Sequence, residues 1–430
     1  MTDPISTQSS SEPAARANSG KVSSIALWQT LLIALVVGLF SVVWLVAYSE
    51  LNSLIWENDF VAANRWTIPV GAIFFSLLVG LVVKYLHAPN VIEGGNAAEA
   101  LAAGDTSGYK TFWGALLSSF FSLLSGASVG PEGPIGFLAV DISEWLALRL
   151  KLAKEAFLPA SLAGLSSAYN GIVGNPVFAA LYASEASGGK GGLALLVADL
   201  AAGAVGFLLF TLLNVPPFAG FLAVPPINSI ETNWVVWAIA LGALGAVLAA
   251  YIAIAFHAAG KLMGVFEDRI ILRALFAGTI IGGVCYFIPE LMFSGESSIH
   301  TIIANAASYG VPMLLLLAVL KPPLLALSFK GGYLGGPIFP SLFTAVMLGL
   351  VINQLVPSLP LAICLTCVEV GVVTLVLKAP LTSILLVTVV ANGDASLDGL
   401  IVVASVTAVI VGQGFQALMA RRSPKAGESA

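Results

Sequence analysis

The chain has 430 residues, of which 58% are hydrophobic and 10% are charged, and its formal net charge at pH 7 is −5. Soluble globular domains carry about 25% charged residues, so this chain has too few polar side chains to cover a water-soluble core of its size. The composition therefore excludes a soluble protein and predicts an all-α polytopic membrane protein, because α-helices satisfy their own backbone hydrogen bonds in lipid.

Apolar runs of membrane-spanning length recur from one end of the chain to the other. A spanning helix needs roughly 20 apolar residues. The clearest runs are Ile25 to Tyr48, Trp66 to Leu86, Leu193 to Leu213, Trp234 to Phe256 and Leu400 to Leu418. The first of them is too long for a signal-peptide core and has no convincing cleavage pattern, so we expect it to be retained. Two shorter segments, about 157–169 and 176–186, fall below spanning length.

The basic residues cluster between the apolar runs and near the chain ends. They are Arg16, Lys21, Arg149, Lys151, Lys154, Lys261, Arg269, Arg273, Arg421, Arg422 and Lys425. The positive-inside rule places these clusters, and both termini, in the cytoplasm. We therefore expect a cytoplasmic tail at 1–20, one transmembrane transport domain at 21–420 and a second tail at 421–430, with Glu50 and Glu57 outside. Contacts with lipid or nucleic acid are a less economical explanation of the same clusters.

The sequence contains no pattern typical of a metal centre or an enzyme. Cys364 and Cys367 form a lone CxxC in an apolar segment, and the three histidines lie far apart in sequence, so neither predicts a metal site. There is no HExxH motif and no pair of intramembrane aspartates. Ser166 and Ser167 fit small-residue helix packing better than a nucleophile. We expect neither a cofactor nor an enzymatic activity.

The chain is organised around the stretch LLSGASVGPEGPIGF, Leu123 to Phe137. One apolar helix pattern runs into this Gly- and Pro-rich break, and a second pattern starts at Pro134. Between the two lies Glu132, the only ionisable residue between Lys110 and Asp141. Ionisable residues inside a membrane are rare and costly, and they mark functional positions by default. The stretch therefore predicts a broken helix that carries a functional carboxylate inside the bilayer.

The two halves of the chain repeat this feature. The segment Gly133 to Ile135 recurs as Gly336 to Ile338, 203 positions later, and Pro176 recurs as Pro380, 204 positions later. Paired Gly- and Pro-interrupted segments in two halves are the best sequence indication of a transport site built from discontinuous helices.

The topology makes this repeat an inverted one. Both termini are expected inside, and an external loop at about 215–232 divides the halves, so the halves enter the membrane from opposite sides. We expect one fold made of two intertwined halves, about 21–214 and 232–420.

The two breaks predict helix starts that attract anions. A helix that begins inside a membrane leaves its first N–H groups without intrahelical partners, and its dipole adds about half a positive charge there. Segments Gly133 to Gly136 and Gly336 to Phe339 therefore both describe amides that face an anion. Since no Lys or Arg lies within either of these segments, binding is expected to be weak and reversible, as an ion pathway requires.

Glu132 fits the same chemistry. Its ionised carboxylate is an anion and can occupy the amides, whereas its protonated form can leave and admit a mobile anion. The alternative is a helix-capping carboxylate that never moves.

Three segments are similar to motifs of one known family. Gly130 to Pro134 looks like a G-R-E-G-P motif, Gly335 to Leu342 like a G-G-I-F-x-P segment, and Lys378 to Ile384 like an A-P-L-T-G-I helix start. These motifs belong to the CLC chloride channels and proton-coupled chloride transporters, and the resemblance covers residues 25–420. It implies a CLC-like inverted repeat with broken and re-entrant helices, without cytoplasmic regulatory domains.

The chain departs from the family pattern at several positions. Pro131 replaces the motif's Arg. Gly95 and Asn96 lie about where the family has its G-S-G-I-P filter segment, so the Asn96 amide would replace a serine hydroxyl. Phe415 lies where the family has a pore tyrosine. Pro337 falls at one amide-donating position, which moves the expected donors to the next two residues.

The internal carboxylate region also differs. Glu185 matches the first of two family carboxylates, and Ala186 replaces the second, which relays protons in many transporters. Glu185 is therefore a possible internal carboxylate.

The resemblance implies Glu132 as the gate of a homodimer with one pore per subunit, in the bacterial inner membrane. The implied anion-binding residues are Gly130, Gly133, Ile135, Gly95, Asn96, Ile338, Phe339 and Phe415. The expected function is transport of a small inorganic anion, chloride first, with membrane lipids but no nucleic acid as further partners. The alternative is a proton-coupled anion antiporter, or a fluoride-type exporter, with a non-standard internal proton relay.

Overall fold

The computed structural model describes residues 25–89, 108–188, 192–219, 222, 224–227, 230–393 and 395–422. This part of the chain is helical, and its one β interaction is an antiparallel bridge between Gly130 and Gly336. The elements of the first half are α1 (Leu27–Trp56), α2 (Asp59–Ala63), α3 (Thr67–Tyr85), η2 (Gly108–Thr111), α5 (Phe112–Leu124), α6 (Glu132–Arg149), η3 (Lys154–Ala156), α7 (Phe157–Ala168), α8 (Asn170–Val173), α9 (Pro176–Ala186) and α10 (Gly192–Leu212).

The second half has counterparts for most of the first-half helices. Its elements are α11 (Thr232–Met263), η4 (Gly264–Phe266), α12 (Ile270–Phe287), η5 (Pro289–Leu291), α13 (Glu296–Ala304), α14 (Ala306–Gly331), α15 (Ile338–Leu355), α16 (Leu361–Leu377), α17 (Pro380–Val390) and α18 (Ala395–Arg422). Helix α14 is kinked at Gly310, where the backbone leaves helical geometry.

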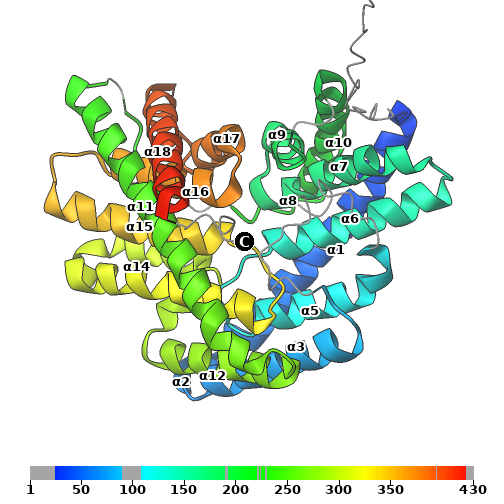
Figure 1. Ribbon diagram of the computed structural model, residues 1–430, viewed down its shortest axis with the longest axis horizontal. Coiled ribbons are helices and arrows are strands. Elements are labelled where there is room, and N and C mark those ends of the chain that lie inside the picture. Colours follow the sequence, from blue (N-terminus) through cyan, green and yellow to red (C-terminus); the bar gives the residue numbers. More distant parts are fainter. Residues whose placement is uncertain are drawn as a thin grey trace, which may run out of the picture.

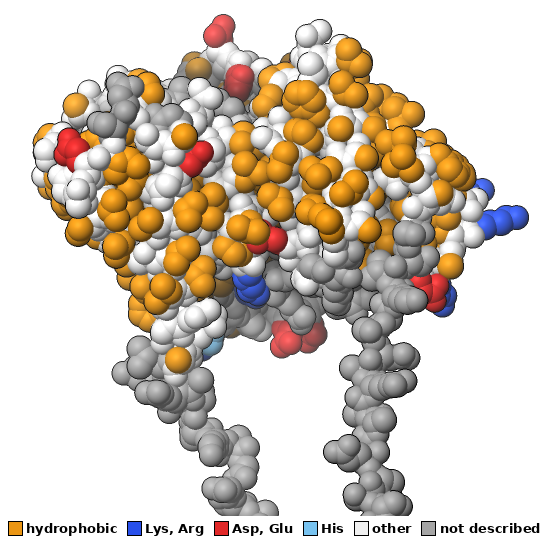
Figure 2. Space-filling view, turned by 90° about the horizontal axis from the view of Figure 1, so that it is seen from above, with side chains coloured by type: hydrophobic (Ala, Val, Ile, Leu, Met, Phe, Trp, Pro, Cys, Tyr) orange, Lys and Arg blue, Asp and Glu red, His pale blue; other side chains and the backbone are white. Residues whose placement is uncertain are grey.

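Eight of the described helices are long and apolar enough to cross a membrane, namely α1, α3, α10, α11, α12, α14, α15 and α18. The protein is thus a multi-span integral membrane protein. Hydrophobic side chains cover most of the described wall in Figure 2, with few charged side chains among them.

Helix α1 is longer than the sequence predicts. It does not end at Tyr48 but continues through Glu50 to Trp56, because no Gly or Pro interrupts that stretch. Glu50 is therefore part of the helix rather than of a loop beyond it, and only a short connection separates α1 from α2.

The inverted repeat is visible in the matching elements. Helices α3 and α12 begin 203 positions apart, and α9 and α17 are both 11 residues long, each with Pro at its start. Helices α6 and α15, which open after the two breaks, are both 18 residues long. In Figure 1, α5 to α10 lie on one side and α14 to α18 on the other, while α3 packs against α12 at the base.

Small residues let the helices pack closely. Helix α11 crosses α16 where Gly245 faces Gly371, so closely that a Cβ on Gly245 would lie 2.7 Å from the Gly371 Cα. Ser167, a candidate for helix packing, donates from its hydroxyl to the Ala34 carbonyl at 2.7 Å and lies against Gly206. Close backbone approach at Gly and Ser is how helices associate when lipid supplies no hydrophobic drive.

Replacing Gly245 with Ala is expected to force α11 away from α16. Overpacking of this kind costs about 1–3 kcal/mol, so the midpoint of thermal unfolding in detergent should fall. Gly414→Ala on α18 is the matched control, because no atom lies within 4 Å of the added Cβ. Equal midpoints for the two variants would contradict the proposed packing role.

Candidate functional site

The two breaks meet at the interface between the halves. Helix α6 begins at Glu132 and α15 begins at Ile338, and the segments before them are joined by the bridge. The Gly130 amide donates to the Gly336 carbonyl at 2.9 Å, and the Gly336 amide donates to the Gly130 carbonyl at 2.8 Å. Non-helical backbone in a membrane needs such partners, because lipid offers none.

Serine hydroxyls tie each break to the other half. The Leu334 amide donates to Ser122 Oγ on α5 at 2.9 Å, and the Ser128 amide donates to Ser328 Oγ on α14 at 3.1 Å. The two helix starts are therefore held in register by reciprocal contacts between segments about 200 positions apart.

The Glu132 carboxylate lies at the start of α15 rather than in lipid. Its side chain is 1% exposed, and its Oε1 accepts a hydrogen bond from the Ile338 amide at 2.7 Å. The Phe339 backbone also interacts with this carboxylate, whereas Oε2 is buried and has no hydrogen-bond partner among the described residues. An anionic oxygen thus occupies the amides that open α15, as the chemistry of a free helix start favours.

Two glycines make room for this carboxylate. A Cβ on Gly336 would collide with the carboxyl group of Glu132, and a Cβ on Gly130 would collide with its Oε2. Close by, Gly133 lies directly against the Gly335 backbone. Glycine is needed at these positions because the Glu132 carboxyl group, or the backbone of the other half, lies where a side chain would begin.

Tyr169 holds the other end of Glu132. Its hydroxyl donates to the Glu132 backbone carbonyl at 2.8 Å, and its ring lies 4.6 Å from that of Tyr182. This role of Tyr169 was not predicted. A buried tyrosine between two short apolar segments was the available signal, but nothing in the sequence links it to Glu132.

Two of the predicted amide donors are already engaged. The Gly130 amide bonds to Gly336, and the Ile135 amide donates to the Pro131 carbonyl at 3.1 Å within the first turn of α6. The bridge and the helix therefore use these two amides in this structure, and their assignment to an anion stays a prediction. Gly95 and Asn96 lie outside the described residues.

Phe415 lies far along α18, in a half-buried position. Helix α18 packs against α11, α16 and α17, as its counterpart α10 packs against α1, α7 and α9. The assignment of Phe415 to the pore stays a prediction.

Glu185 occupies a second helix start. Its Oε2 accepts from the Thr382 amide at 2.7 Å and from the Thr382 hydroxyl at 2.6 Å, and its Oε1 accepts from the Leu381 amide at 3.2 Å. The carboxylate on α9 thus caps α17 of the other half, just as Glu132 on α6 caps α15. The sequence pointed to Glu185 but not to this partner.

An acidic cavity of about 410 Å³ lies near Glu132. Tyr48, Glu50, Glu57 and Glu296 are among the side chains that line it. Glu296 interacts electrostatically with Glu132.

The loop after α10 lies over the same region. The ring of Phe218 from this loop packs edge-on against Phe339 at a centroid distance of 4.9 Å, and thereby covers the start of α15.

Lys321 is a buried basic side chain that was not predicted from the sequence. It is 0% exposed on α14, and its Nζ donates to the carbonyls of Leu291 at 3.0 Å and Phe293 at 2.6 Å. The Phe293 amide in turn donates to the Gly126 carbonyl in the first break at 3.1 Å. A lone Lys inside an apolar run was the signal that could have found it.

The centre combines backbone amides at a helix start with a carboxylate that occupies them. Among the described residues, no group of three His, Cys, Asp or Glu side chains is arranged to hold a metal ion. The chemistry that this arrangement allows is exchange of one negative group for another at a helix start.

Known proteins resemble this chain in sequence. The profile of the family described as "Voltage gated chloride channel" matches residues 75–413. The "Putative ion-transport protein YfeO" of Shigella boydii (strain Sb227) and that of Escherichia coli (strain SE11) are each 28% identical over 298 residues, which cover 67% of this chain and 69% of the relative.

Solved structures share the fold. A slow cyanobacterial Cl⁻/H⁺ antiporter superposes with a TM-score of 0.76 at 17% identity, over 94% of this chain and 100% of that one. A CLC-type fluoride/proton antiporter gives a TM-score of 0.74 at 15% identity, over 91% and 98% of the two chains. With its paired broken helices and its family match over most of its length, this chain belongs to the CLC family of anion-transport proteins.

Proposed function

We propose that the protein transports a small inorganic anion, chloride first, past the start of α15, and that Glu132 is its gate. The observation that carries this proposal is the hydrogen bond from the Ile338 amide to the Glu132 carboxylate. A carboxylate oxygen in that position stands where a mobile anion would bind, so the two compete for the same amides.

The chemistry of this position suits an anion that binds briefly and leaves, as transport requires, rather than one that stays bound. The amides and the helix dipole supply partial charges only, and no described basic side chain donates a hydrogen bond or ion pair to the Glu132 carboxylate. An anion held in this way can also leave. Protonation of Glu132 removes the competing charge, so lower pH on the side that reaches it is expected to favour anion entry.

The assembly belongs to the same proposal. We infer a homodimer in a bacterial inner membrane, with both termini in the cytoplasm and one pathway per subunit. Bacterial relatives and the basic clusters beside the spans support this placement.

The second candidate is proton-coupled antiport of chloride or fluoride. The two similar structures are described as Cl⁻/H⁺ and fluoride/proton antiporters, which favours this candidate by analogy. Glu185 is the carboxylate available for an internal relay, because Ala186 follows it where the family pattern has a second acid.

Glu132→Gln is expected to raise anion flux from reconstituted vesicles by about tenfold and to flatten its dependence on pH. Charge-assisted hydrogen bonds are worth about 1–2 kcal/mol more than neutral ones, so the neutral amide side chain competes less well for Ile338. The measurement is chloride efflux between pH 4.5 and 7.5. Glu155→Gln, an exposed acid on η3, is the matched control. Unchanged flux in Glu132→Gln would count against the gate.

Gly336→Ala is expected to give the same high flux by a different route. The added Cβ occupies the space of the Glu132 carboxyl group and displaces it from α15. Gly399→Ala, where no atom lies within 4 Å of the new Cβ, is the control. If Gly336→Ala folds and transports as slowly as the wild type, the carboxylate does not block the path from this position.

A proton gradient distinguishes the two candidates. An antiporter accumulates anion against its gradient when protons flow the other way, whereas a passive pathway does not. If the wild type accumulates chloride or fluoride and Glu185→Gln does not, while its passive flux persists, Glu185 is the relay. Glu155→Gln serves again as the control, and absence of uphill uptake in the wild type would eliminate the antiporter.

A further inference from the structure

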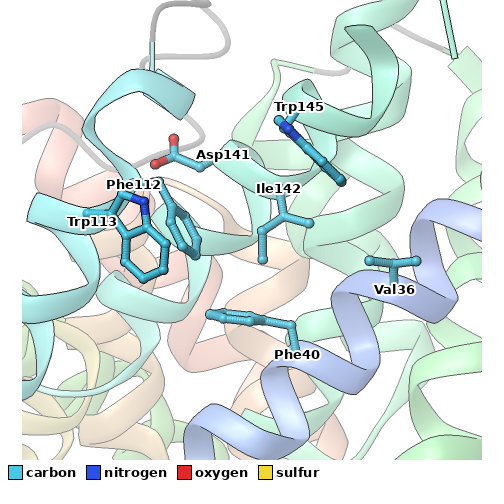
Figure 3. Close-up of a pocket in the computed structure, with 7 residues that line it drawn as sticks. All are labelled: Val36, Phe40, Phe112, Trp113, Asp141, Ile142 and Trp145. Atoms are coloured by element: carbon cyan, nitrogen blue, oxygen red, sulfur yellow. The ribbon is translucent and has the colours of Figure 1, made fainter. Parts of the chain in front are cut away.

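A pocket on the wall of the molecule is separate from the Glu132 site. It has a volume of about 390 Å³ and lies between α1, α5 and α6, as Figure 3 shows. Its lining residues are Val36, Phe40, Phe112, Trp113, Asp141, Ile142 and Trp145. Asp141 is nine residues beyond Glu132 on α6, about 13 Å along the helix axis.

The pocket combines aromatic rings with one carboxylate. Phe40 and Phe112 lie 5.8 Å apart between ring centroids, and Phe112 and Trp113 lie 5.4 Å apart. Figure 3 shows the Asp141 carboxyl group beside the Phe112 and Trp113 rings, with Trp145 on the other side of the opening. Aromatic faces and an anion together are the surroundings that bind an organic ammonium group.

Asp141 is a buried acid that lines the pocket. It is 4% exposed, and its Oδ2 has no hydrogen-bond partner among the described residues. Glu144, also buried, repels it, and no described positive side chain acts on it. A buried ionised carboxylate without a partner costs several kcal/mol, so a bound cation would stabilise this arrangement.

The rim of the pocket carries the opposite charge. The Arg149 guanidinium lies 5.3 Å from the centre of the Trp145 ring, and the exposed Lys110 precedes Phe112 by two positions. Trp113 is 69% exposed and Trp145 is 44% exposed, so the pocket opens at the surface of the protein. Tryptophan and basic residues at the ends of apolar helices mark the level of the lipid headgroups.

We propose that this pocket binds the headgroup of an aminophospholipid, with its ammonium group against Asp141 and its phosphate near Arg149 and Lys110. The carboxylate inside the pocket matches the positive ammonium group of such a headgroup. The cations at the rim match its negative phosphate. A lipid is the appropriate source because α1 is long and apolar enough to cross a membrane, α5 is an apolar helix, and the Trp113 and Trp145 rings at the pocket are exposed. This inference does not depend on which ion the protein transports.

Native mass spectrometry of the purified full-length protein tests the proposal. Phosphatidylethanolamine and phosphatidylglycerol with the same acyl chains are offered at equal concentration, and the retained lipid is counted. The wild type is expected to retain phosphatidylethanolamine about tenfold better than phosphatidylglycerol. This factor corresponds to a difference in binding free energy of about 1.4 kcal/mol. Asp141→Asn is expected to reduce this preference to within about twofold.

Further variants separate the pocket from general lipid contact. Trp113→Leu should weaken retention of phosphatidylethanolamine, whereas Trp28→Leu, an equally exposed position on α1 outside the pocket, should not. Thermal unfolding identifies a variant that fails to fold, in which case Trp145→Leu replaces it.

Several results would overturn the proposal. They are equal retention of the two lipids by the wild type, an unchanged preference in Asp141→Asn, or equal losses in Trp113→Leu and Trp28→Leu. If soluble phosphoethanolamine displaces the lipid at equal concentration, the pocket serves a soluble amine and the lipid assignment fails.

Discussion

One interaction between the two halves determines the geometry of the centre: the Glu132 carboxylate, at the first residue of α6, accepts the amide that opens α15. A helix that starts inside a membrane leaves donors that lipid cannot satisfy. Here an acid from the opposite half satisfies one of them. The bridge between Gly130 and Gly336 and the serine hydroxyls on α5 and α14 satisfy the backbone around it. The broken helices therefore stabilise each other, and neither half could bury its break alone.

The repeat is symmetric in shape but not in chemistry. Helices α6 and α15 match in length, yet the position equivalent to Glu132, 203 residues later, is Gly335. The first half thus supplies the acid, and the second half supplies the amides and the space. Glu185 on α9 and the start of α17 repeat this division. In both places a carboxylate of the first half occupies a helix start of the second half.

Buried ionisable side chains differ in whether the chain supplies them with partners. Glu132 has backbone amides, and Lys321 has two carbonyl oxygens. By contrast, Asp199 and Glu369 are fully buried, and none of their carboxylate oxygens has a hydrogen-bond partner in the described part of the chain. Asp141 belongs with these two acids but differs because it lines an open pocket, where a ligand from outside the chain can supply the missing charge.

The sequence by itself determined the class, the repeat and the central acid. Hydrophobic composition and run length depend only on residue type, and Gly and Pro mark a helix break wherever they occur. Pairing across the halves was decided only by the tertiary structure, because contacts between residues 200 positions apart leave no local pattern. For this reason the bridge that engages the Gly130 amide was not foreseen, whereas Glu132 was. Tyr169 and Lys321 bond within their own halves, to residues 37 and 30 positions away, and these contacts also depend on how the helices pack.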